Sequence, residues 1–273
     1  MEGPSLVILN EELMPFIGKK VLKVTGNTKQ PKEELKGCTL SQVDTWAKVL
    51  FMTFTPPQKN KDSIITKTHF LLFGSYRINE PKENRSPRLE LKFDNGVLYL
   101  YSCSINFDAK EALESVDREV DVMAPEWNED HVVELMAKKK DSYLCDLFLD
   151  QNIFAGSGNI VKNEVLFNIR KHPLTKLSEI DKKYWPELAH EVRNYCFNFY
   201  EWKKKYELMR HWQVYRRHYC PICSRKLIKE KMGKGKRGTF YCEHCQKQHS
   251  KKFEVYEVLP MRERKGKKER FDH

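Results

Sequence analysis

Apolar residues in the first 108 positions fall into short runs separated by polar turns, which is the pattern of β-strands. The triplet Asp94-Asn95-Gly96 between the last two runs is typical of a tight hairpin turn. Segments 56–67 and 79–88 are rich in Lys, Asn, Ser and Pro, so we expect exposed loops there. Short strands joined by polar turns predict a β-sandwich or a flattened barrel. The expected strands are residues 5–9, 21–24, 49–54, 68–73, 89–93 and 97–102.

From about residue 110 the spacing of apolar residues becomes that of helices. Asn128 precedes the first of them and has a side chain suited to a helix N-cap. The second and third helices are separated by Gly156-Ser157-Gly158, and Pro173 follows the third. A β part is therefore followed by a separate helical part. The expected helices are residues 131–140, 143–154 and 159–170, with one or two more within 180–210.

The positive charge of the chain is concentrated at its C-terminal end. The whole sequence has a formal charge of +11, and residues 216–273 hold 18 Lys and Arg against 7 Asp and Glu. The first 215 residues are neutral overall. Such a segment favours a polyanionic partner, with nucleic acid the first candidate and a membrane surface the second. The 40% hydrophobic content is sufficient for folded cores.

No apolar run approaches the length of a membrane span, and the N-terminus lacks the pattern of a signal peptide. We therefore expect a protein that is not secreted. Its compartment would be the cytoplasm or nucleoid in a bacterium and the nucleus in a eukaryote. In a reducing compartment, scattered cysteines are buried thiols rather than disulfides. These cysteines are Cys38, Cys103, Cys145 and Cys196.

Four further cysteines form two tight pairs, Cys220-Pro-Ile-Cys223 and Cys242-Glu-His-Cys245, separated by 18 residues. Each pair can place two thiolates on one metal, and four sulfur ligands favour one tetrahedral Zn²⁺. Because four thiolates leave no open position on the ion, we expect it to be structural. A redox function is the alternative, but the pairs lack the βαβ surroundings of thioredoxin-like proteins.

The loop between the pairs, residues 229–239, is basic and contains three glycines. A zinc-stapled hairpin with such a tip can enter a groove and contact phosphates. The alternative is a solvated loop without a partner. Its basic residues include Lys231, Lys234, Lys236 and Arg237.

Four short motifs occur in order along nearly the whole chain. They are Glu2-Gly3-Pro4, Lys48 at the end of 43–48, the segment 150–160, and the hairpin 236–246 around the second cysteine pair. Together they resemble the formamidopyrimidine-DNA glycosylase and endonuclease VIII family. In that family the third motif is the helix–two-turn–helix signature and the fourth is the zinc-finger hairpin. The segment 69–77 is more similar to the endonuclease VIII branch.

The resemblance implies an α+β multidomain protein with DNA lying across a cleft between its two main parts. Its partner would be DNA that contains oxidised bases or abasic sites, with no membrane partner, and its cofactor one structural Zn²⁺. We expect a monomer. The expected domains are an N-terminal β-sandwich catalytic domain (1–118), a helical helix–two-turn–helix DNA-binding domain (119–215), a four-cysteine zinc finger (216–250) and a basic C-terminal tail (251–273).

In this family the nucleophile is the α-amine of the N-terminal residue, which attacks C1′ of a flipped-out nucleotide. An α-amine suits this step because its unperturbed pKa of about 7.7–8.0 leaves a neutral fraction at physiological pH. Relatives usually begin Met-Pro-Glu-Gly-Pro, whereas no proline precedes Glu2 here, so we expect the primary amine of Met1 to act. The resemblance assigns proton transfer to Glu2 and a phosphate-binding, cationic role to Lys48. The alternatives are an exposed terminal residue and a strand-edge lysine.

The resemblance also assigns DNA contacts to the helical turn, the finger and one strand. Gly158 would let a phosphate approach the helix N-terminus, and Asn159 would add a donor or cap the helix. Arg237 would bind phosphates near the flipped nucleotide. An apolar strand segment can either fill the hole left by the flipped base or belong to the β core. The residues of that segment are Leu71, Leu72 and Phe73, with His69 beside them.

The expected function is a bifunctional DNA glycosylase and AP lyase that removes oxidised bases, pyrimidines foremost, and nicks the strand by β,δ-elimination. The alternative is a non-catalytic member of the same family that binds damaged DNA. A generic zinc-ribbon transcription factor would explain the finger, but it would leave Glu2, Lys48 and the Gly158-Asn159 turn unexplained.

Overall fold

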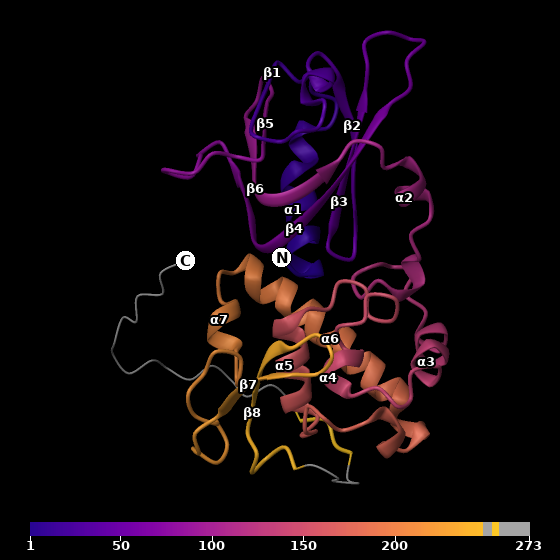
Figure 1. Ribbon diagram of the computed structural model, residues 1–273, viewed down its shortest axis with the longest axis vertical. Coiled ribbons are helices and arrows are strands. Elements are labelled where there is room, and N and C mark those ends of the chain that lie inside the picture. Colours follow the sequence, from indigo (N-terminus) through magenta and orange to yellow (C-terminus); the bar gives the residue numbers. More distant parts are fainter. Residues whose placement is uncertain (248–252, 257–273) are drawn as a thin grey trace.

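The N-terminal part of the chain is one antiparallel sheet in this computed structural model (Figure 1). The strand order is β1-β5-β6-β4-β3-β2. Backbone hydrogen bonds between residues 18–21 and 37–40 join the two edges, as from Val21 N to Cys38 O at 2.9 Å. The sheet therefore closes on itself around an apolar core, which agrees with the β-sandwich or flattened barrel expected from the sequence. The strands are β1 (Lys23–Thr25), β2 (Thr39–Trp46), β3 (Val49–Thr55), β4 (Ile64–Ile78), β5 (Leu89–Lys92) and β6 (Val97–Asn106).

The run at residues 5–9, expected as a strand, is instead part of helix α1 (Gly3–Leu13). Leu6, Leu9 and Leu13 recur at helical spacing, and all three are fully buried in the core of the β part. Pro4 lies in the first turn, where the missing N–H would have no partner within the helix. The strand prediction was wrong because an apolar run of five residues does not by itself distinguish the two periods.

The second part of the chain is helical and is built around the long helix α6. Asn128 caps α3 as expected, since its side-chain oxygen accepts a hydrogen bond from His131 N at 3.2 Å. The third expected helix is confirmed as α5, which ends two residues earlier than expected. The helices are α2 (Lys110–Glu114), α3 (Glu129–Ala137), α4 (Leu144–Leu147), α5 (Asn159–Asn168), α6 (Trp185–Lys204) and α7 (Leu208–His211), with short 3₁₀ turns at Met14–Phe16, Lys32–Leu35, Arg118–Val120, Leu177–Glu179 and Lys182–Tyr184.

The expected helix 143–154 was wrong beyond its first turn, which is α4. In the second half of this segment, polar side chains form hydrogen bonds with backbone N–H and C=O groups that would otherwise pair within a helix. Asp150 accepts a hydrogen bond from Asn152 N, and Gln151 accepts one from Gly156 N while donating to two carbonyl oxygens. Such local bonds compete with helix formation and hold the segment as a turn before α5.

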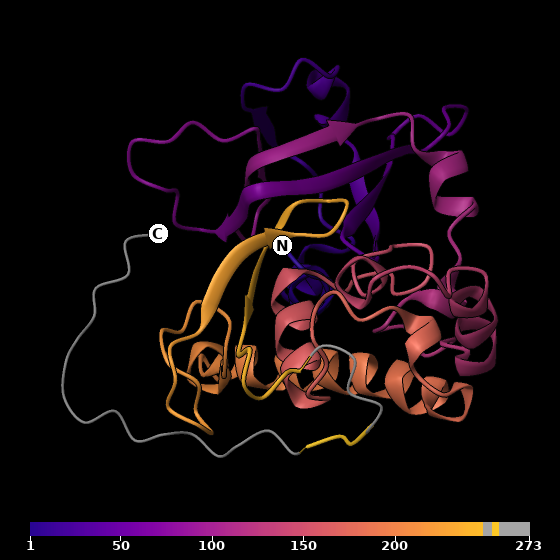
Figure 2. The same ribbon diagram turned by 60° about the horizontal axis from the view of Figure 1, so that its bottom comes forward.

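The third part is the hairpin β7 (Ile228–Met232) and β8 (Arg237–Tyr241), whose tip reaches the boundary between the other two parts (Figure 2). Asp146 holds the tip, since its carboxylate accepts a hydrogen bond from Lys234 N at 2.9 Å. The structure describes residues 1–247 and 253–256. The expected basic tail (251–273) lies largely outside the described residues, as does the end of the expected finger segment (216–250).

The β and helical parts meet where the N-terminus lies (Figure 1). Helix α1 packs against α6, and Lys204 of α6 pairs with Glu11 of α1 at 2.8 Å. The turn between β2 and β3 forms hydrogen bonds with the segment that links the two parts. Within the described residues, no helix is both long and apolar enough to cross a membrane.

Candidate active site and DNA-binding cleft

A cleft of about 2130 Å³ lies where the β part, the helical part and the finger hairpin meet. Its lining brings together segments that are more than 200 residues apart in the sequence. Every residue to which the resemblance assigns catalysis or DNA contact lies on it. These residues are Met1, Glu2, Lys48, His69, Leu71, Leu72, Phe73, Gly158, Asn159 and Arg237.

Glu2 is held by the N-terminus of α5. Its carboxylate accepts hydrogen bonds from Ile160 N at 2.7 Å and from Val161 N at 3.4 Å. A Cβ added at Gly158 would lie 2.3 Å from the carboxyl carbon of Glu2, so glycine is required there to admit this side chain. The sequence suggested that the first amides of this helix and Gly158 receive a phosphate, whereas in the structure Ile160 and Val161 donate to Glu2. Burial raises the pKa of Glu2, and Lys48 and the two amides oppose this effect.

Two amines lie close enough to Glu2 for the three charges to influence one another. Burial lowers the pKa of the Met1 α-amine, Lys48 lowers it further, and the Glu2 carboxylate opposes both. Burial also lowers the pKa of Lys48, again against the effect of Glu2. A lower pKa leaves a larger neutral, nucleophilic fraction of an amine at neutral pH. The shifts favour a protonated carboxyl group on Glu2 and a neutral amine on Met1.

Lys48 does not lie within a strand but in the turn between β2 and β3, where Trp46 pairs with Val49. Val49 in turn pairs with His69 on β4, which places this histidine near Lys48. Burial lowers the pKa of His69, and the positive charges of the N-terminal amine and Lys48 lower it further. These effects favour the neutral form of His69.

Leu71, Leu72 and Phe73 project from a bulge in β4, where its pairing with β6 shifts between Phe70 and Ser75. Their side chains are 50%, 71% and 73% exposed, whereas the neighbouring Phe70 is buried. The alternative that these three residues belong to the β core is therefore wrong. Bulges redirect side chains, and this bulge places three large apolar residues on the lining of the cleft.

Side chains of helix α5 also form hydrogen bonds with the finger hairpin. Asn159 Nδ2 donates to Gly238 O at 3.0 Å, and Lys162 Nζ donates to Thr239 Oγ1 at 2.8 Å. Asn163 Oδ1 accepts a hydrogen bond from Phe240 N at 2.7 Å. Burial lowers the pKa of Lys162 to about 8. Lys162 and Asn163 were not expected from the sequence, although polar residues in the middle of a helix with apolar neighbours were an available signal.

These contacts fix the edge of the finger that carries Arg237, whose side chain is exposed in the cleft. Asn159 Oδ1 is buried, and no hydrogen-bond partner is found for it among the described residues. Helix α5 and the finger hairpin are thus joined by side-chain hydrogen bonds, and Asn159 and Arg237 both line the cleft.

The four cysteines of the two pairs come together at the base of the finger. Their sulfur atoms all lie within 4.8 Å of one another, with 3.8 Å between Cys220 and Cys245 and 3.4 Å between Cys223 and Cys242. Sulfur atoms bound to one tetrahedral zinc at about 2.3 Å would lie about 3.8 Å apart, so the donor set fits this ion. The finger holds one structural Zn²⁺, as the sequence predicted.

Comparison with known proteins agrees with this architecture. Residues 218–248 match a zinc-finger family described as "Zinc finger found in FPG and IleRS". The chain is 32% identical over 83% of its length to the mouse protein "Endonuclease 8-like 3" and spans 37% of that relative's length. It is 25% identical to a Lactobacillus delbrueckii formamidopyrimidine-DNA glycosylase, over 90% of this chain and 99% of that relative.

A solved structure of Lactococcus lactis formamidopyrimidine-DNA glycosylase superposes with a TM-score of 0.74 at 21% identity, covering 90% of this chain and 100% of that one. The β part, helical part and four-cysteine finger therefore form the fold of the zinc-finger DNA glycosylases. The chain belongs to the formamidopyrimidine-DNA glycosylase and endonuclease VIII family.

Proposed function

We propose that this protein is a bifunctional DNA glycosylase and AP lyase that removes oxidised bases, chiefly pyrimidines, from DNA. The observation that carries the proposal is the position of Met1, Glu2 and Lys48 in the cleft beside the finger hairpin and the exposed apolar bulge. A nucleophile, a proton donor and a cation are the groups that such a reaction requires. The Lactococcus lactis relative was solved with DNA containing an abasic site, which supports DNA as the partner.

In the proposed reaction the α-amine of Met1 forms a bond to C1′ of the flipped nucleotide as the bond from C1′ to the base breaks. The base leaves with a proton, and the amine gives up one. Glu2 in its carboxyl form donates a proton to the ring oxygen O4′ as the sugar ring opens, which leaves a Schiff base between the amine and C1′. Loss of a C2′ proton then expels the 3′ phosphate, and a second elimination expels the 5′ phosphate.

The cleft offers distinct groups for holding the DNA. Arg237 lines the cleft, and its guanidinium would bind a phosphate by two parallel hydrogen bonds. Leu72 and Phe73 are the most exposed residues of the bulge and would enter the stack where a base has left it. Lys48 would neutralise the phosphate beside the lesion. The alternative function, binding damaged DNA without chemistry, uses the same surface but makes no covalent bond.

Borohydride reduction separates the two functions in one experiment. With abasic-site DNA the protein is expected to give one covalent adduct, because borohydride reduces the Schiff base to a stable amine. Peptide mapping should locate the adduct on Met1, and the intact mass should identify the N-terminal residue of the protein assayed. An undamaged duplex is the control and should give no adduct. Binding without an adduct would support the non-catalytic alternative, and an adduct on Lys48 would refute the assignment of Met1.

Replacing Arg237 by Ala is expected to weaken binding to damaged and undamaged DNA equally, because an arginine that binds a phosphate does not read the base. The slope of log K against log salt should become shallower by about 0.9 for each phosphate that the variant no longer neutralises. Titrations at several salt concentrations would measure both effects. The matched control is Arg85→Ala, since Arg85 is exposed outside the cleft. An unchanged slope in Arg237→Ala would contradict the assignment.

A further inference from the structure

The turn that carries Lys48 is held by an aspartate from the other side of the domain boundary. Asp121 lies in the segment that links the β part to the helical part and is 5% exposed. One carboxylate oxygen accepts a hydrogen bond from Ala47 N at 2.7 Å, and the other accepts one from Met123 N at 2.9 Å. We infer that Asp121 is a positioning residue that fixes Lys48 relative to Glu2, an inference that rests on the proposed function.

The turn needs such a partner because its backbone is strained. The pairing of Trp46 with Val49 leaves Ala47 and Lys48 as the two residues of a tight hairpin turn. Ala47 has φ of 53°, the left-handed region that glycine normally occupies. An alanine keeps this conformation only where its surroundings impose it. The hydrogen bond from Ala47 N to the Asp121 carboxylate helps to hold Ala47 in this conformation.

The same aspartate is tied by its backbone to the segment that meets the N-terminus. Asp121 forms a parallel β-bridge with Ala155, in which Val122 N donates to Ala155 O at 2.9 Å. The next residue, Gly156, accepts a hydrogen bond from Gly3 N at 2.8 Å. An unbroken series of hydrogen bonds and peptide links therefore runs from the Lys48 turn through Asp121 to the residue after Glu2.

The backbones of Gly3, Ala47 and Gly156 also lie close together. A Cβ added at Gly3 would lie 2.8 Å from the Cα of Gly156 and 3.2 Å from the carbonyl oxygen of Ala47. There is consequently no space for the turn to move toward the N-terminal segment without displacing it. A shift of the turn would change the position of Lys48 and Glu2 together, and catalytic rates are sensitive to displacements of this kind.

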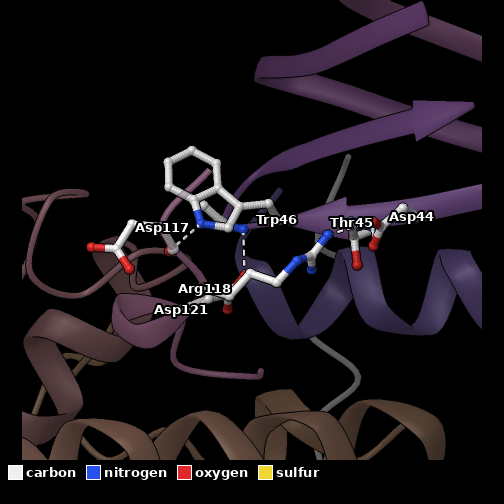
Figure 3. A network of polar contacts seen from close by, with 7 residues as sticks. Asp44, Thr45, Trp46, Asp117, Arg118 and Asp121 are labelled. Carbon is white, nitrogen blue, oxygen red and sulfur yellow. Dashed lines mark hydrogen bonds and ion pairs between the residues drawn. The ribbon is translucent and has the colours of Figure 1, made fainter. Parts of the chain in front are cut away.

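Further contacts hold the outer side of the turn, as Figure 3 shows. The indole Nε1 of Trp46 donates to Asp117 O at 2.7 Å, and Arg118 forms an ion pair with Asp44. Both contacts connect β2 to the short turn that precedes Asp121. They limit rotation of the β part against the linking segment, whereas Asp121 alone among these side chains binds the backbone next to Lys48.

The test is Asp121→Asn, which preserves shape but replaces one acceptor by an NH₂ group, so that one of the two amides is left without its partner. The amide of residue 47 is expected to exchange hydrogen about tenfold faster. The single-turnover rate of base release should fall about tenfold to a hundredfold, with DNA affinity within about twofold of the parental value. The matched control is Asp117→Asn in the same segment, whose side chain contacts His131 and Glu119 but not the turn. It should leave the exchange at residue 47 and the rate unchanged.

A second variant tests whether backbone strain is the cause. Glycine adopts a positive φ without strain, so Ala47→Gly added to Asp121→Asn should recover part of the reduced rate while exchange at residue 47 remains fast. If Asp121→Asn does not fold, the double variant is measured instead, and parental protection at residue 47 would overturn the inference. Unchanged exchange or an unchanged rate in Asp121→Asn would also overturn it, as would an equal reduction of rate and affinity. A parental protein without base release or adduct would instead refute the proposed function.

Discussion

Replacing Glu2 by Gln is expected to reduce base release about 10²–10⁴-fold while DNA affinity stays within about twofold. The amide keeps the shape of the carboxyl group and retains an oxygen that can accept the hydrogen bond from Ile160 N. It cannot donate a proton to the sugar oxygen and take it back. Because Glu2 is half-buried and its carboxylate is bonded to amides of α5, loss of its charge should change chemistry more than binding.

Single-turnover release of thymine glycol from a duplex, together with a binding titration on the same duplex, would measure this effect. Glu33→Gln is the matched control, since Glu33 is exposed in the β part away from the cleft and should behave as the parental protein. If Glu2→Gln releases the base at the parental rate, the assignment of proton transfer to Glu2 is wrong.

Replacing Cys242 by Ser is expected to cause loss of zinc and at least a tenfold loss of DNA affinity, because structural zinc contributes about 10–16 kcal/mol of apparent binding energy in isolated fingers. Cys242 directly follows β8, and this strand carries Arg237 and the carbonyl of Gly238 that Asn159 binds. Without the fourth thiolate the hairpin would be ordered by its small apolar core and by its hydrogen bonds to α5 and Asp146, without the metal. The β part has its own core and should remain folded.

Metal analysis of the purified protein and a binding titration would test this expectation. The parental protein should contain one zinc per chain and Cys242→Ser much less. Cys38→Ser supplies the control, because Cys38 lies in the β part and its thiol donates to Glu34 O, a bond that a serine hydroxyl can also make. Normal DNA affinity in a zinc-free Cys242→Ser protein would show that the metal does not order the DNA-binding surface.

The sequence by itself determined the features whose signals are local. The two cysteine pairs specified the zinc site, because a thiolate pair at that spacing has few other uses. Asn128 marked the start of α3, since a capping side chain acts within three residues of its own position. The Asp94-Asn95-Gly96 turn connects β5 and β6, as its sequence predicted. The ordered motifs indicated the family and the residues that line the cleft.

Tertiary structure decided what depends on contacts between distant segments. Residues 5–9 became helical because the core of the sheet receives Leu6, Leu9 and Leu13 on one side of a helix. The bulge in β4, and not the apolar character of residues 71–73, exposes their side chains to the cleft. Glu2 acquires its amide donors from α5, 158 residues away, and Ala47 its acceptor from Asp121. These partners are close only in the folded chain, because hydrogen bonds and burial depend on distance in space and not along the sequence.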